Sequence, residues 1–165
     1  MKIRLLMAIL IVVSVSCNEK KEEALNEFTL KSTGLSGFLF ETLRVINYPN
    51  SNNLMPDFGV FAQGTESGET IYPFLSHYEF KTKFYLIEKF VEFEIALERF
   101  ETYELPSDYE TYEFDTIAYM VQPNQIWLIK LKEEKFGIIL TKSTYHNDDN
   151  NNAYAEVTFK ARRIN

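Results

Sequence analysis

The clearest hydrophobic pattern lies in the last third of the chain. Two apolar runs, residues 126–132 and 135–145, are joined by Glu133-Glu134, and a polar loop leads from the second run to residues 153–163. Apolar and polar side chains alternate along the first and last of these segments, which is typical of strands with one buried face. We therefore predict an antiparallel meander. The positions expected on its buried face are Trp127, Ile129, Leu131, Ala155, Val157, Phe159 and Ala161.

Shorter apolar runs predict further strands upstream. They cover residues 37–46, 57–63, 80–87 and 117–122, and residues dense in Gly, Pro, Asn and Ser separate several of them. The run 71–75 contains Pro73, which lacks an N–H for a sheet ladder and therefore favours an edge position.

The hydrophobic period changes after residue 89. Phe90, Phe93, Leu97 and Phe100 recur at spacings of three, four and three residues, which predicts one apolar face of an amphipathic helix over residues 89–103. Such an aromatic stripe usually faces a core. We expect either this helix or a second sheet to cover the buried face of the meander.

Together these patterns predict a β-rich α+β fold, with an antiparallel meander or sandwich-like sheet and one amphipathic helix. The 14 Phe, ten Tyr and one Trp provide ample material for a core. Residues 32–165 are predicted to form one globular domain, because their length suits a single hydrophobic core. The single cysteine allows no disulfide within the chain, so packing must stabilise this domain.

The first 17 residues follow a different pattern. Lys2 and Arg4 are followed by an apolar run that ends near Val15, and Ser16 precedes Cys17. This order is typical of a secretory signal, which we place at residues 1–16. The run is shorter than the roughly 20 residues that a membrane-spanning helix needs.

The sequence Ser14-Val15-Ser16-Cys17 resembles the lipobox of bacterial lipoproteins. The resemblance implies a diacylglycerol on the Cys17 thiol and a further acyl chain, such as palmitate, on the new N-terminus. Several acyl chains hold a protein durably on a membrane. Residues 17–31 are then expected to form a lipidated tether, and the protein to be attached to the outer membrane.

Two readings of the charged residues after Cys17 remain open. Lys21-Glu22-Glu23 resembles the signal that directs lipoproteins of the Bacteroidota to the outer face of the outer membrane, which implies exposure at the cell surface. The alternative is a plain hydrophilic spacer, because a short charged run cannot bury apolar surface.

The charge balance bears on the partners. A mature chain from Cys17 contains 15 basic and 24 acidic side chains, a formal charge of −9. Such a chain is repelled by phosphate-rich surfaces, which argues against nucleic acid as a partner. The expected partners are the membrane, through Cys17, and an unknown protein or small molecule.

The C-terminal segments Trp127 to Leu140 and Ala155 to Lys160 resemble the final strands of HmuY-like lipoproteins of the Bacteroidota. Residues 134–138 lack the first glycine and the second lysine of the turn in that family. The resemblance implies a β-rich domain and, as an alternative function, haem binding through two histidines. The chain has two histidines, His77 and His146, which are then the candidate axial ligands.

Other candidate sites have simpler interpretations. The loop 147–152 is rich in Asn and Asp, which suit a hard cation but also dominate ordinary turns. Four of the five carboxylates in the segment 104–116 would serve a carbohydrate-active enzyme, or they belong to a solvated connection. These carboxylates are Asp108, Glu110, Glu113 and Asp115.

No signature of a nucleophile elbow, zinc protease or phosphate-binding loop is present in the sequence. We therefore predict no catalytic residues and no resident cofactor. The expected function is that of an outer-membrane or surface lipoprotein with a non-catalytic binding domain. Its binding surface is predicted to lie on the loops 50–56, 64–68 and 146–152, with haem binding and carbohydrate chemistry as alternatives.

Overall fold

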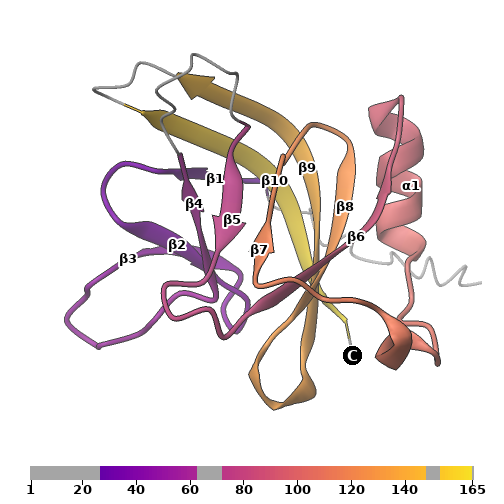
Figure 1. The fold of residues 1–165 in the computed structure, drawn as a ribbon, viewed down its shortest axis with the longest axis horizontal. Helices are drawn as coiled ribbons and strands as arrows, with labels where there is room; N and C mark the ends of the chain where they lie inside the picture. Colours follow the sequence, from indigo (N-terminus) through magenta and orange to yellow (C-terminus); the bar gives the residue numbers. More distant parts are fainter. Residues whose placement is uncertain (1–26, 63–71, 148–152, 165) are drawn as a thin grey trace, which may run out of the picture.

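The computed structural model describes residues 27–62, 72–147 and 153–164. These residues form two antiparallel five-stranded sheets, and the helix α1 (Phe93–Thr102) lies beside the larger sheet (Figure 1). The predicted β-rich α+β fold with one amphipathic helix is confirmed. None of the helices in the described ranges is long and apolar enough to cross a membrane.

The larger sheet contains the predicted meander. Its strand order is β1-β10-β9-β8-β6, and every neighbouring pair is antiparallel. The C-terminal strands pair as the hydrophobic pattern predicts, with Trp127 opposite Ile139 and Val157 opposite Thr144. The five strands are β1 (Glu27–Lys31), β6 (Lys83–Lys89), β8 (Gln125–Lys130), β9 (Phe136–Asn147) and β10 (Tyr154–Ile164).

The smaller sheet has the order β3-β2-β4-β5-β7. The single strand predicted over residues 37–46 is wrong: the chain turns at Phe40–Leu43, where the Leu43 N–H donates to the Phe40 carbonyl. β5 follows Pro73 and lies between β4 and β7, so the predicted edge position is also wrong. The strands are β2 (Ser36–Leu39), β3 (Arg44–Asn47), β4 (Phe58–Phe61), β5 (Phe74–Ser76) and β7 (Ile117–Ala118).

Aromatic rings fill the space between the two sheets. Phe38, Phe58 and Phe159 are fully buried, and the Phe38 ring lies 5.7 Å from that of Phe58 and 5.2 Å from that of Phe159. The face predicted for the meander contributes to this core, which confirms its orientation. The members from the larger sheet are Leu30, Phe84, Trp127, Ile129, Ile139, Ala155, Val157, Phe159 and Ala161.

The helix α1 covers the opposite face of the larger sheet. Its Ala96 and Phe100 are fully buried in a second core, which also contains Ile126 and Leu128 of β8. The pattern predicted that either a helix or a second sheet covers the meander, and the structure has both, one on each face. Consequently β8 and the first half of β9 are buried on both sides.

An arginine from the last strand fixes the end of this helix. Arg162 donates from Nε and Nη2 to the Phe100 carbonyl at 3.0 and 2.8 Å, and its Nη2 also donates to the Tyr103 carbonyl. Carbonyls at a helix C-terminus lack partners within the helix, and a cation is favourable there. Arg162 therefore attaches α1 to β10.

The predicted boundary between tether and domain is too late in the chain. Residues 27–31 form β1, which pairs with β10, and Leu30 is fully buried between the sheets. The globular part therefore includes Glu27. Residues 1–16, Cys17 and the rest of the expected tether up to residue 26 lie outside the described residues.

Candidate ligand-binding groove

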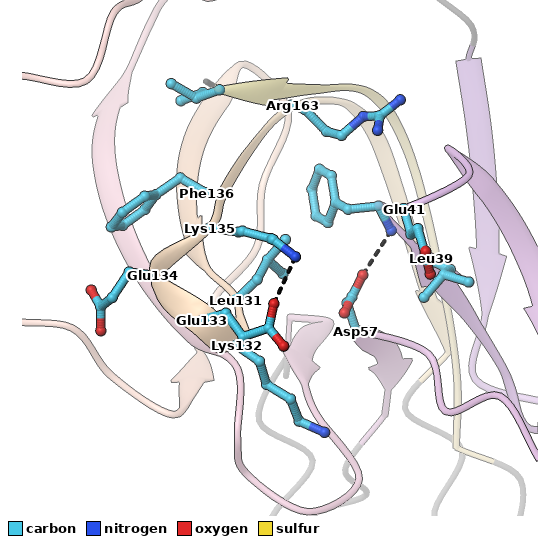
Figure 2. A pocket seen from close by; sticks show the side chains of 12 residues that line it. Leu39, Glu41, Asp57, Leu131, Lys132, Glu133, Glu134, Lys135, Phe136 and Arg163 are labelled. Atoms are coloured by element: carbon cyan, nitrogen blue, oxygen red, sulfur yellow. Dashed lines mark hydrogen bonds and ion pairs between the residues drawn. The ribbon is translucent and has the colours of Figure 1, made fainter.

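An open groove of about 750 Å³ lies at one end of the sandwich. It lies between the β2–β3 turn, the residue before β4, the β8–β9 turn and the end of β10 (Figure 2). Segments far apart in the sequence thus meet there. The lining residues are Leu39, Phe40, Glu41, Asp57, Leu131, Lys132, Glu133, Glu134, Lys135, Phe136, Arg163 and Ile164.

The apolar part of the groove is built on a close approach between two strands. Phe40 is 1% exposed, and its ring lies against Gly137 of β9. A Cβ atom at position 137 would lie 2.3 to 2.6 Å from three carbons of this ring. Only glycine allows such an approach. The other apolar residues that line the groove are Leu39, Leu131, Phe136 and Ile164.

Asp57 brings a partly desolvated carboxylate to the groove. Its Oδ2 accepts a hydrogen bond from the Phe40 N–H at 2.7 Å (Figure 2). Burial raises the pKa of Asp57 above its ordinary value, the Phe40 N–H opposes this, and the charge of Glu41 adds to the increase. No ion pair to Asp57 is present within the described ranges. Among the described residues, the carboxylate is therefore held by one backbone donor.

The β8–β9 turn forms the opposite wall. Glu133 and Glu134 have φ angles of 60° and 56°, a left-handed conformation that is uncommon for side chains of this kind. Ion pairs of 2.7 Å hold both glutamates, to Lys135 and Lys130 respectively. The Leu131 N–H also donates to the Lys135 carbonyl at 2.8 Å. The turn is thus kept in one conformation by contacts of its own residues.

Four charged residues of the groove have no ion pair among the described residues: Glu41, Asp57, Lys132 and Arg163. Lys132 still acts on Asp57 at longer range, since its charge lowers the pKa of that carboxyl. The groove thus combines carboxylates, cations and an apolar lining. Side chains of this kind can bind and orient a charged ligand.

The structure places His77 in a buried position after β5. It is 4% exposed, and its Nδ1 accepts hydrogen bonds from the N–H groups of Glu79 (2.8 Å) and Lys81 (3.4 Å). Burial lowers the pKa of His77, which favours the neutral ring. With Nδ1 accepting, the proton of the neutral ring resides on Nε2. This arrangement leaves no ring nitrogen of His77 with a lone pair for an iron atom.

The two candidate haem ligands have different neighbours in the described residues. His146 lies near the end of β9, with its ring 5.9 Å from that of Tyr72. His77 instead follows β5, where its ring accepts from the N–H groups of Glu79 and Lys81. Axial ligands of one haem must meet at a single iron atom.

The other predicted sites do not converge on the groove. The acidic side chains of the segment 104–116 are exposed, and none lines the groove; they are Asp108, Glu110, Glu113 and Asp115. Within the part of the chain that the structure describes, no group of three or more His, Cys, Asp or Glu could hold a metal ion.

Of the three predicted binding loops, one is described in full. In the loop 50–56, the Asn50 side chain donates to the Leu54 carbonyl and accepts from the N–H groups of Asn52 and Leu54, so the loop is organised around Asn50. The loops 64–68 and 148–152, including most of the possible cation site, lie outside the described residues.

The groove residues had little local signal in the sequence. Glu133-Glu134 were expected to connect two strands, which is correct, but Asp57 was expected only as the beginning of a strand. Comparison with known proteins adds no assignment, because no family model, curated protein or solved structure matches this chain.

Proposed function

We propose that this chain is an outer-membrane lipoprotein, attached through Cys17, whose β-rich domain binds a small ligand in the groove without catalysis. The attachment is supported by the signal-like residues 1–16 and by the lipobox-like sequence before Cys17. The binding role is supported by the groove and its charged lining.

The observation that carries the binding role is the state of Asp57. Its carboxylate is partly buried beside Glu41, and burial raises its pKa, yet it has a single backbone donor and no ion pair among the described residues. Burial of a charge is unfavourable unless it is paired. A ligand with a positively charged nitrogen would provide the missing partner, and groups with perturbed pKa values in a concave site are candidates for such a role.

The anchor keeps the groove near the membrane. Nine residues, 18–26, separate Cys17 from the first strand. From Cys17 to Glu27 such a chain spans at most about 36 Å when fully extended. The expected ligand is therefore one that the domain meets close to the membrane surface. Mass spectrometry of the native protein tests the attachment: an unacylated Cys17, or a retained segment 1–16, would contradict it.

Calorimetric titration of the full mature chain in detergent tests the binding role. The probe is phenethylamine, a cation with an aromatic body, and its neutral control is 2-phenylethanol. We expect phenethylamine to bind and the alcohol to bind at least about tenfold more weakly, because a charge-assisted hydrogen bond contributes roughly 1.5–3 kcal/mol. The amide signal of Phe40 should shift in NMR spectra, since this N–H donates to Asp57.

Variants locate the binding. Asp57→Asn removes the charge but keeps an oxygen that can accept from Phe40, and it should abolish the preference for the amine. Glu113→Gln removes an exposed carboxylate that does not line the groove, and it should change nothing. Equal binding of amine and alcohol, or equal loss in both variants, would contradict a cation site at Asp57.

A further inference from the structure

We infer that the ligand of the groove is a zwitterion, a small molecule that carries an ammonium group and a carboxylate on one apolar body, as a free aromatic or aliphatic amino acid does. This inference rests on the proposed binding of a cation at Asp57. It adds a second recognition element, Arg163, for a carboxylate.

The groove residues Asp57, Glu41 and Arg163 come from different parts of the fold. Asp57 precedes β4, and Glu41 lies in the β2–β3 turn, whereas Arg163 is on β10. Arg163 is paired in the sheet with Gly137, against which the Phe40 ring packs. Figure 2 shows Arg163 and Asp57 on opposite sides of the groove. A ligand lying over the apolar lining would therefore have a carboxylate on one side and a guanidinium on the other.

Some charged residues of the groove are already paired with one another, and the others remain available to a ligand. Lys135 is paired with Glu133, and Glu134 is paired with Lys130, so these wall residues neutralise one another. Arg163 and Lys132 have no such pair in the described ranges, and neither have Asp57 and Glu41. A ligand with one charge would match only one sign of these groups, whereas a zwitterion complements both.

The chemistry of the individual groups agrees with this assignment. A guanidinium presents a planar fork of donors that matches a carboxylate in a bidentate manner. Asp57 and Glu41 together suit an ammonium, which has three donors. The lining of Leu39 and Phe40 suits an apolar side chain rather than a further polar group.

Three probes with the same aromatic body test the inference by calorimetry on the full mature chain in detergent. They are L-phenylalanine, phenethylamine, which lacks the carboxylate, and 3-phenylpropanoate, which lacks the ammonium. We expect L-phenylalanine to bind about tenfold more tightly than phenethylamine, and 3-phenylpropanoate to bind most weakly.

Arg163→Gln should remove the tenfold advantage of L-phenylalanine over phenethylamine, because it removes the guanidinium that pairs with the carboxylate. Arg163→Lys should retain only part of the advantage, because an ammonium lacks the planar fork. The matched control is Arg44→Gln, which removes an exposed arginine of β3 that does not line the groove. This variant should bind all three probes like the unmodified chain.

The outcomes separate this inference from the proposed function. If phenethylamine binds at Asp57 but L-phenylalanine binds no better, or if Arg163→Gln keeps the advantage, the zwitterion assignment is wrong and the cation site stands. If neither phenethylamine nor L-phenylalanine binds, both the cation site and the zwitterion assignment are wrong.

Discussion

The strands β2 and β4 contribute both to the aromatic core at the centre of the sandwich and to the charged groove at its end. Phe38 of β2 and Phe58 of β4 face each other in the sheet, and both are fully buried among aromatic rings. The groove is lined by Leu39, one residue after Phe38, and by Asp57, one residue before Phe58. The comparison shows that a single step along a strand leads from a neutral, ring-packed core to a partly desolvated charge.

This contrast has an energetic meaning. The rings of the core are in contact with one another and contain no group that needs a polar partner, so their burial stabilises the fold. In the groove, a partly buried carboxylate and two left-handed glutamates each oppose stability. Such features persist at sites that serve a ligand. Four predictions, from the largest expected effect to the smallest, test this division.

The largest effect is expected in the core. Phe58→Ala should lower the free energy of unfolding by about 3–5 kcal/mol, because it removes a buried ring and leaves a cavity. Urea denaturation measures this loss. Phe80→Ala is the matched control, since Phe80 is 58% exposed, and it should have little effect. Similar losses in the two variants would contradict a central role for the Phe58 ring.

A moderate effect is expected where the core and the groove meet. Gly137→Ala should lower the free energy of unfolding by about 1–3 kcal/mol, because the new methyl group overlaps the Phe40 ring, which is itself buried. The control is Gly59→Ala, whose Cβ would lie 3.1 Å from the Tyr78 hydroxyl and should be tolerated better. A stable Gly137→Ala variant with unchanged groove chemistry would show that Phe40 can move away.

A smaller, pH-dependent effect is expected at His77. Burial lowers the pKa of His77 in the folded protein, whereas the unfolded chain takes up a proton near the ordinary value of 6.5. The unfolded state therefore binds more protons as the pH falls below 6.5, and the stability should decrease there until the folded His77 also titrates. His77→Asn keeps an oxygen that can replace Nδ1 as acceptor. In urea denaturation, this variant should lose the decrease in stability below pH 6.5. If its stability depends on pH as that of the unmodified chain does, His77 is not the group responsible.

The smallest effect is expected at Asp57, with the opposite sign. Its pKa is raised in the folded protein, so the folded state retains the proton when the unfolded chain has already lost it near 3.8. The stability contributed by this group should therefore decrease as the pH rises from about 3.8 through the raised pKa. Over the same pH window, the free energy of unfolding of Asp57→Asn should therefore rise relative to that of the unmodified chain. A difference that does not vary with pH would contradict a desolvated carboxylate at this position.

Local signals explain which elements could be predicted. The helix α1 and the strands β8, β9 and β10 have long, regular hydrophobic periods, and such periods depend only on neighbouring residues. The turn between β2 and β3 was missed because no glycine marks it: Leu43 adopts a φ of 47° instead. Other turns likewise use non-glycine residues at positive φ, among them Phe80 and Met120. Turn signals read from composition therefore fail at these positions.

The candidate site was less predictable than the fold. Asp57, Gly137 and Arg163 have no common spacing in the sequence. They meet because Phe40, in the turn after β2, packs against Gly137 of β9, which pairs with Arg163 of β10. The two histidines attracted attention because imidazoles bind iron, yet the nitrogen Nδ1 of His77 accepts hydrogen bonds from two backbone N–H groups. Residue type indicates a possible chemistry, whereas the neighbours decide whether the atoms are available for it.

The sequence by itself determined the β-rich character, the C-terminal meander, its inward face and the aromatic face of the helix, because each follows from periods of two or about 3.6 residues. The tertiary structure decided that both faces of β8 and β9 are covered, that residues 27–31 belong to the domain, and that Asp57 and Arg163 line one groove. The physical reason is that these features depend on pairings between residues far apart in the chain, such as Leu30 with Val157, which no local period contains.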